Sequence, residues 1–351
     1  MKEVRIGIIG VGGIACGAHI PQIKNTDCGK LVAICDIDEE KLRVVGEREG
    51  IDPKYRFTDY HDLIACDIVD AVEICTPNYL HVPMAIDVMK SGKPVHCEKP
   101  LSVNYEMAKT VLPVVEETKV PNMMTFTYRF QPSVRFARDI IKKGKLGKIL
   151  SINVEYLKDS AFMEGRRLEW RFIKEYAGTG VLGDLGVHLL DMVRFLVGDV
   201  KAVCGTADII VKERKKIGSE EIGKVETDDF CNFLAEVEGG AQATFSITRC
   251  AIGNHNTIKY GIYGTEGVIL FNLNDSTVLD ICIGDIDVQA NGMHTVKVPT
   301  KYYTNQEQTF VNLVNGKFDE ETLPTLKEGV ECQKILDAIL ESSEKRCWIE
   351  V

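Results

Sequence analysis

The chain has 351 residues, of which 45% are hydrophobic and 27% are charged, a balance typical of globular proteins. This length predicts two domains, residues 1–126 and 127–351, each large enough to bury a core. A formal net charge of -10 argues against nucleic acid and anionic membranes as partners, and no apolar run is long enough to span a membrane.

The first 126 residues alternate short apolar stretches with amphipathic ones. The predicted strands are 4–9, 31–36, 55–57, 70–75, 94–97 and 121–126, and the predicted helices are 14–24, 39–49, 60–65, 79–91 and 103–118. Regular alternation of strands and helices predicts an α/β domain with a doubly wound parallel sheet and helices on both of its faces.

The first strand turns into the first helix through the pattern Gly10-x-Gly12-x-x-Ala15. Gly10 permits the tight turn, Gly12 lets the backbone approach a diphosphate, and Ala15 lets helix and strand pack closely. The second strand ends in Asp36, about 20 residues beyond the loop, where a carboxylate can accept a hydrogen bond from a ribose hydroxyl. The combination predicts dinucleotide binding, and a βαβ unit of purely structural meaning is the alternative.

Asp36 also bears on the choice of dinucleotide. A carboxylate accepts from a free ribose 2′-hydroxyl but repels a 2′-phosphate, and the next residue, Ile37, is no arginine that could receive one. Lys41 and Arg43 lie nearby and add positive charge. We therefore expect NAD in preference to NADP.

Two further polar segments follow predicted strands of this domain. Thr76-Pro77-Asn78, with His81, either contacts cofactor ribose and phosphate or caps the next helix. The segment Glu98-Lys99-Pro100 follows the strand at 94–97, at the edge where open α/β sheets bind their ligands. A lysine there can donate to a substrate oxygen, and an ordinary surface lysine is the alternative.

Beyond residue 130 the pattern changes, because strand-like stretches follow one another without regular helices between them. Predicted strands are 148–158, 200–212, 227–237, 241–250, 256–263, 267–272 and 277–283, and predicted helices are 132–143, 184–197, 304–316 and 325–344. Glycine-bearing turns between neighbouring strands favour hairpins, so this region is predicted to be an α+β domain with a large antiparallel sheet.

Asp184 and His188 lie four residues apart on the helix predicted at 184–197, so their side chains share one face. A histidine can act as a general base near neutral pH, and a carboxylate beside it can fix its tautomer or bind a substrate hydroxyl. The alternative makes Asp184 a helix N-cap and His188 a core residue. Asp191 is a competing partner for the histidine.

Twelve cysteines raise the question of disulfides or bound metal. None are spaced as Cys-x-x-Cys, and most lie in apolar stretches, among them Cys35, Cys75, Cys97, Cys204, Cys231 and Cys282. This usage predicts buried free thiols and no metal site, and it fits a reducing cytoplasm. The first strand begins at Val4 beside charged residues, so we expect no cleavable signal.

Taken in order, these motifs resemble those of the glucose-fructose oxidoreductase and inositol dehydrogenase family (Gfo/Idh/MocA). The matching segments are Gly10 to Ala15, Asp36, Thr76-Pro77-Asn78 with His81, Glu98-Lys99-Pro100, Tyr128-Arg129-Phe130 and Gly183-Asp184-x-Gly186-x-His188-x-x-Asp191. The resemblance covers nearly the whole chain. It implies a Rossmann domain followed by a domain with a large open antiparallel sheet, often used to form homodimers or homotetramers.

The resemblance implies catalytic roles for Lys99, Asp184 and His188. With it, the expected cofactor-binding residues are Gly10, Gly12, Gly13, Ile14, Ala15, Asp36, Ile37, Thr76, Pro77, Asn78, His81, Glu98, Lys99 and Arg129. The expected substrate-binding residues are Lys99, Tyr128, Arg171, Asp184 and His188, of which Arg171 resembles a family element near the nicotinamide.

We therefore expect a cytoplasmic NAD-dependent dehydrogenase that oxidises a secondary alcohol of a sugar, sugar derivative or cyclitol. His188 would accept the hydroxyl proton, helped by Lys99, and Asp184 would orient the histidine or the substrate. One alternative is a glycosidase or lyase that oxidises its sugar only transiently and then returns the hydride. The other is a non-catalytic NAD(H)-binding sensor with the same fold.

Overall fold

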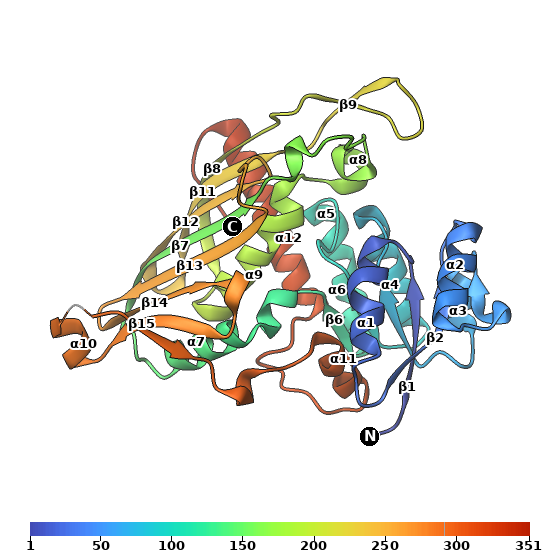
Figure 1. Cartoon of the computed structure of the whole chain (residues 1–351), viewed down its shortest axis with the longest axis horizontal. Coiled ribbons are helices and arrows are strands. Elements are labelled where there is room, and N and C mark those ends of the chain that lie inside the picture. Colours follow the sequence, from blue (N-terminus) through green and yellow to red (C-terminus); the bar gives the residue numbers. More distant parts are fainter. Residues whose placement is uncertain (291) are drawn as a thin grey trace. The chain divides into compact units, whose positions relative to one another are not determined.

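The structure is a computed structural model that describes residues 1–290 and 292–351 (Figure 1). The chain forms two compact units, Met1–Phe126 with Thr304–Val330, and Thr127–Tyr303 with Glu331–Val351. The sequence pattern predicts that all residues after 126 belong to the second domain. The structure differs there, because residues 304–330 return to the first unit.

The first unit is built on a six-stranded parallel sheet in the order β3-β2-β1-β4-β5-β6. Its strands are β1 (Val4–Ile9), β2 (Gly29–Cys35), β3 (Arg56–Phe57), β4 (Ala71–Ile74), β5 (Val95–Cys97) and β6 (Asn122–Met124). Its helices are α1 (Ile20–Ile23), α2 (Glu39–Glu49), α3 (Tyr60–Ala65), α4 (His81–Lys90), α5 (Tyr105–Ala108), α6 (Leu112–Thr118) and α11 (Gln306–Val314). This arrangement confirms the predicted doubly wound sheet.

Two predicted helices of this unit are shorter than expected. The stretch 14–24 begins as a π-helical turn, Ala15–His19, before α1. The stretch 103–118 divides into α5 and α6 around a 3-10 turn, and Pro113 lies in the first turn of α6. Proline lacks a backbone N–H, so it is tolerated at a helix start and disfavoured inside one.

The second unit is built on a nine-stranded sheet in the order β16-β15-β14-β13-β7-β12-β11-β8-β17. The strands are β7 (Ile149–Lys158), β8 (Val200–Asp208), β11 (Phe230–Val237), β12 (Ala241–Thr248), β13 (Asn256–Gly264), β14 (Gly267–Asn272), β15 (Val278–Ile283), β16 (His294–Lys297) and β17 (Ile349–Glu350). The predicted open sheet is confirmed, but it is mixed, because β7 and β12 run parallel. A separate hairpin of β9 (Glu213–Lys215) and β10 (Ile222–Lys224) was not predicted.

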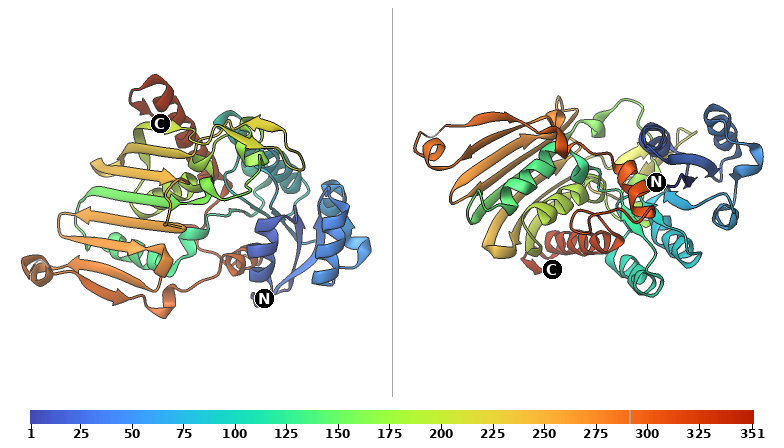
Figure 2. Two further views of the ribbon diagram at one scale, coloured as in Figure 1. Left: turned by 45° about the horizontal axis from the view of Figure 1, so that its top comes forward. Right: turned by 90° about the horizontal axis from the view of Figure 1, so that it is seen from below.

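Helices cover one face of the nine-stranded sheet and leave the other open. Figure 2 shows α7 (Pro132–Lys142), α9 (Val187–Leu196) and the later part of α12 (Leu326–Lys345) against the same face. The shorter helices are α8 (Lys174–Ala177) and α10 (Asp285–Ala290). Along β11 and β12 burial alternates residue by residue, which is the pattern of a sheet with one packed and one solvated face.

The cysteines are free thiols throughout the chain. Cys35, Cys75, Cys97 and Cys231 are buried as predicted, whereas Cys204 and Cys282 are only half-buried. No helix among the described residues is long and apolar enough to cross a membrane.

Candidate active site

The glycine loop lies at the carboxyl end of β1. Gly10 adopts φ +89°, and a Cβ there would lie 2.7 Å from the backbone oxygen of Cys75, so only glycine fits. A Cβ on Gly12 or Gly13, in contrast, would meet nothing within 4 Å. Ala15 is fully buried behind the loop. The loop therefore presents open backbone on its outer side, which is what a diphosphate requires.

Asp36 follows β2 and joins this loop. Its Oδ2 accepts a hydrogen bond from the Val11 N–H at 3.0 Å, and its Oδ1 accepts from the Asp38 N–H at 3.0 Å. The apolar side chains beside it are open to solvent, with Ile37 92% and Ile14 42% exposed. A half-buried carboxylate next to open backbone and exposed apolar groups fits the ribose, diphosphate and flat base of a dinucleotide. The residues present therefore fit NAD.

Replacing Gly12 by alanine is expected to raise the KM for NAD while leaving the melting temperature almost unchanged. The added methyl group meets no protein atom, so it interferes only with the bound diphosphate. Gly17→Ala is the matched control, because its Cβ also meets nothing within 4 Å and it lies on the following turn. Equal NAD affinity in the two variants would contradict a diphosphate at Gly12.

The turn after β4 carries the predicted Thr76, Pro77 and Asn78. The cap positions of the following 3-10 turn and of α4 are Pro77 and Leu80, so the interpretation of Thr76 and Asn78 as caps is wrong. His81 is 1% exposed, and its ring nitrogens lie 2.7 Å from the Pro100 oxygen and 2.8 Å from the Thr76 oxygen. Burial lowers the pKa of His81, although both carbonyls oppose this shift. The ring thus ties the turn after β4 to the turn after β5.

Lys99 is half-buried in the turn directly after β5. The carboxylate of Glu98 is nearly buried and accepts from the Lys99 backbone N–H at 3.1 Å, while its other oxygen lies 2.9 Å from His19 Nε2. Burial alone would raise the pKa of Glu98, but the hydrogen bond with His19 and the positive charge of Lys99 lower it to about 2. The predicted cofactor residue Glu98 therefore holds the backbone that presents Lys99.

Asp184 and His188 lie in the second unit. Asp184 is in a π-helical turn, Leu182–Gly186, that leads into α9, and the cap position of that turn is Val181. The interpretation of Asp184 as an N-cap is therefore wrong. Asp184 is half-buried, whereas His188 is 7% exposed in the first turn of α9.

The backbone before Asp184 is held by a residue that the sequence analysis missed. Asp228 is 6% exposed, and its carboxylate accepts from the N–H groups of Gly180 at 2.5 Å and Leu182 at 2.8 Å. A Cβ on Gly180 would lie 1.9 Å from the backbone oxygen of Asp228, so the close approach requires glycine. Burial raises the pKa of Asp228, against the effect of these N–H groups. No sequence motif marks this role, because Asp228 is 44 residues away from Asp184.

Two tyrosines accompany His188. The Tyr128 ring packs edge-on against the His188 ring at 4.7 Å between centroids, and its hydroxyl lies 2.9 Å from that of Tyr156. Burial raises the pKa of Tyr156, and the neighbouring Tyr128 and Asp184 raise it further. The second unit thus gathers an imidazole, a carboxylate and two phenol hydroxyls in one place.

Two predicted arginines have other partners in the structure. Arg129 is 4% exposed, and its guanidinium donates to both carboxylate oxygens of Asp191 at 2.6 to 3.0 Å. Its predicted contact with the cofactor, and the predicted contact of Asp191 with His188, stay predictions. Arg171 is half-exposed, lies over the Trp170 ring at 4.4 Å and is 3.7 Å from Glu169.

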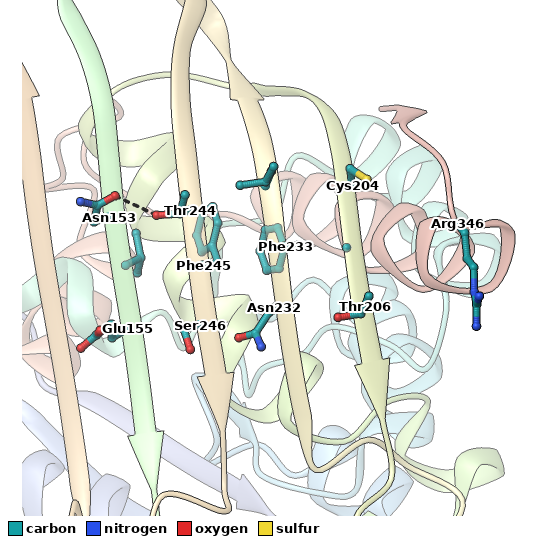
Figure 3. Close-up of a pocket in the computed structure, with 13 residues that line it drawn as sticks. Asn153, Glu155, Cys204, Thr206, Asn232, Phe233, Thr244, Phe245, Ser246 and Arg346 are labelled. Carbon is teal, nitrogen blue, oxygen red and sulfur yellow. Dashed lines mark hydrogen bonds between the residues drawn. The ribbon is translucent and has the colours of Figure 1, made fainter.

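A shallow hollow lies on the open face of the nine-stranded sheet, with a volume of about 1020 Å³ (Figure 3). Its polar lining includes Asn153, Glu155, Asn232 and Ser246, which project from neighbouring strands. None of the predicted catalytic residues lines it. The hollow is therefore a feature of the exposed sheet face and does not belong to the candidate active site.

Comparison with known proteins places the chain in a family. Residues 4–126 match an oxidoreductase family with an NAD-binding Rossmann fold, and residues 134–270 match the Gfo/Idh/MocA C-terminal domain. Levoglucosan dehydrogenase of Pseudarthrobacter phenanthrenivorans is 31% identical over 323 residues, which cover 84% of this chain and 83% of that protein. Inositol 2-dehydrogenase of Rhizobium meliloti is 25% identical over 347 residues, covering 98% of each chain.

A solved structure of levoglucosan dehydrogenase in complex with NADH and levoglucosan superposes with a TM-score of 0.91. It is 29% identical in sequence and covers 100% of this chain and 99% of its own. The chain therefore belongs to the Gfo/Idh/MocA family of oxidoreductases and is an NAD-dependent dehydrogenase acting on CH–OH groups.

Proposed function

We propose that the protein oxidises a secondary alcohol of a sugar, sugar derivative or cyclitol, and catalyses the reverse reduction with the same residues. The observation that carries this proposal is the position of Lys99. It directly follows β5, at the carboxyl edge of the sheet that also carries the glycine loop and Asp36. Ligands of open α/β sheets bind at this edge, which supports the proposal that Lys99 acts on the substrate beside the bound cofactor.

NAD, when held by the glycine loop and Asp36, would supply the hydride acceptor for the carbinol carbon of the substrate. His188 removes the hydroxyl proton as general base, and Lys99 donates a hydrogen bond to the same oxygen and stabilises its developing negative charge. Asp184 orients the imidazole or a neighbouring hydroxyl of the substrate. The Tyr128 ring restricts the orientation of the imidazole, since it packs against it edge-on.

The relatives support this substrate class, because levoglucosan dehydrogenase and inositol 2-dehydrogenase act on a sugar derivative and a cyclitol. The decisive experiment measures NADH formation with a panel of levoglucosan, inositols, aldoses, sugar acids and glycosides. Steady NADH formation with one of them supports net oxidation. Cleavage of a glycoside without net NADH formation would favour transient oxidation, and no response to any compound would favour a sensor.

The preference for NAD is expected to weaken in Asp36→Asn. Asparagine retains an oxygen for the Val11 N–H but loses the charge that binds a ribose hydroxyl and repels a 2′-phosphate. Because a hydrogen bond to a charged group contributes about 1.5–3 kcal/mol, the ratio of kcat/KM for NAD over NADP should fall about 10- to 150-fold. Asp38→Asn is the matched control. A wild-type enzyme that uses NADP more efficiently than NAD would contradict the assignment.

We further propose that the protein forms a homodimer or homotetramer through the open face of the nine-stranded sheet. Apolar side chains interrupt its polar surface, with Leu234 47% and Tyr263 37% exposed. Exposed apolar groups on a broad sheet face favour association with a second copy. The free thiols support a cytoplasmic location, since cysteines stay reduced there.

A further inference from the structure

The interior of the first unit holds a cluster of four titratable side chains that the proposed reaction does not use. They are His19 at the end of the π-helical turn, Glu73 in β4, His96 in β5 and Glu307 in α11. Each is at most 2% exposed, and one ligand atom from each lies within 4.8 Å of the others. Glu73 and His96 are neighbours in register on adjacent parallel strands, so the sheet itself sets their spacing.

Three atoms of this cluster are buried without a hydrogen-bond partner in the part of the chain that the structure describes. They are Glu73 Oε1, His96 Nδ1 and Glu307 Oε2. The imidazole nitrogen faces the two carboxylate oxygens at 3.8 Å and 3.4 Å. Burying several such atoms without a partner is unfavourable, which points to a group that they surround.

The outer nitrogens of both imidazoles have partners of their own. His19 Nε2 lies 2.9 Å from Glu98 Oε1, and His96 Nε2 lies 3.1 Å from the hydroxyl of Thr125, which donates to the Cys97 backbone oxygen. With N–H groups at these outer positions, each Nδ1 presents a lone pair to the interior. Outer partners of this kind orient histidines that bind metals and fix their tautomer.

The inner atoms also have the spacing of a coordination shell. His19 Nδ1 lies at hydrogen-bond distance from Glu73 Oε2, 2.9 Å, and 3.3 Å from Glu307 Oε1. His96 Nδ1 lies 3.4 Å from Glu307 Oε2 and 3.8 Å from Glu73 Oε1, so both oxygens of each carboxylate face the imidazoles. In a tetrahedral zinc site with bonds near 2.1 Å, neighbouring ligand atoms are about 3.4 Å apart. The four nitrogen–oxygen distances, 2.9 to 3.8 Å, lie on both sides of this ligand spacing.

We propose that His19, Glu73, His96 and Glu307 bind one divalent transition-metal ion, with Zn²⁺ as the probe, in a buried structural site. Two imidazole nitrogens and two carboxylate oxygens suit such an ion, and the two carboxylates balance its charge. Four protein ligands fill a tetrahedral shell, so no position remains open for substrate. The site joins Glu307 of the returning segment to β4 and β5, and through His19 and Glu98 it reaches the Lys99 backbone.

The cysteine spacing predicts no metal site, and the site proposed here contains no cysteine. Sequence spacing gave no sign of the cluster, because its residues extend from position 19 to position 307. Only the return of α11 to the parallel sheet brings the fourth ligand in.

The test uses the purified full-length protein. Metal analysis should find about one transition-metal ion per chain, and removal by a chelator should lower the melting temperature in a way that added Zn²⁺ reverses. Co²⁺ added to the metal-depleted wild type should give the intense visible absorption of a tetrahedral site. Both readouts are independent of any sugar substrate, so they do not depend on the proposed function.

Variants distinguish a bound metal ion from a cluster of the same side chains held together by hydrogen bonds alone. His96→Gln should abolish stoichiometric binding, whereas His61→Gln, which alters an exposed histidine beside Asp59, should retain it. Thr125→Ala should weaken Zn²⁺ binding about 10- to 100-fold, and Thr125→Ser should restore it. The proposal is overturned if chelator-treated wild type neither binds Zn²⁺ or Co²⁺ in equimolar amount nor changes its melting temperature. Equal metal binding by the His96 and His61 variants would overturn it as well.

Discussion

Replacement of His188 by asparagine is expected to lower kcat about 100- to 10,000-fold, the usual contribution of general acid-base catalysis. Asparagine is polar and of similar size, so it can occupy the place beside Tyr128, but it cannot exchange a proton near neutral pH. The affinity for NADH should stay nearly unchanged, because the glycine loop and Asp36 belong to the other unit. Initial rates with the best substrate of the panel and fluorescence titration of NADH measure both quantities.

His255→Asn provides the matched control for this experiment. His255 lies in the same unit, its side chain is 90% exposed, and its partner is Asp159. Its replacement should leave kcat unchanged. Full activity in His188→Asn would contradict its role as general base, and a melting temperature well below that of wild type would favour a structural role instead.

Replacement of Lys99 by methionine is expected to lower kcat about 100- to 1,000-fold, as loss of one donor to a developing oxyanion does. Methionine retains most of the length of the side chain and removes its charge. The turn should survive, because it is the Lys99 backbone N–H that bonds to Glu98. A parallel measurement of kcat and KM shows whether the loss lies in the chemical step.

Lys90→Met is the control, since Lys90 is an exposed lysine at the end of α4. It should behave as wild type. Lys99→Arg should recover little activity, because the guanidinium is wider and its donors have a fixed planar geometry. Unchanged turnover in Lys99→Met would remove the lysine from the mechanism.

Local patterns were enough to predict the fold of the first unit and its cofactor edge. Strand and helix alternation determines which way each strand runs, and parallel strands bring their carboxyl ends to one edge. Gly10, Asp36 and Lys99 follow three different strands, so their common edge could be inferred without coordinates. The binding of NAD could be inferred from the same residues at this edge.

Contacts between distant parts of the chain could not be predicted from the sequence. The mixed order of the nine-stranded sheet depends on β7 pairing with both β12 and β13, about 90 to 115 residues later, and no turn sequence encodes that. The π-helical turn at Leu182–Gly186 is held by Asp228, which lies 46 residues beyond Leu182 in the sequence. Helical periodicity alone predicted a regular helix there.

The return of residues 304–330 has a consequence for how the molecule is made. Asn122 accepts a hydrogen bond from the Leu326 N–H, Met124 donates one to Pro324, and Lys2 donates one to Asn315. Domains generally fold as they leave the ribosome, amino-terminal part first. Here the nucleotide-binding unit stays incomplete until residues 304–330 have been synthesised, so residues 1–126 must wait while the whole of 127–303 is made, and chaperones have their longest opportunity to bind them during that interval.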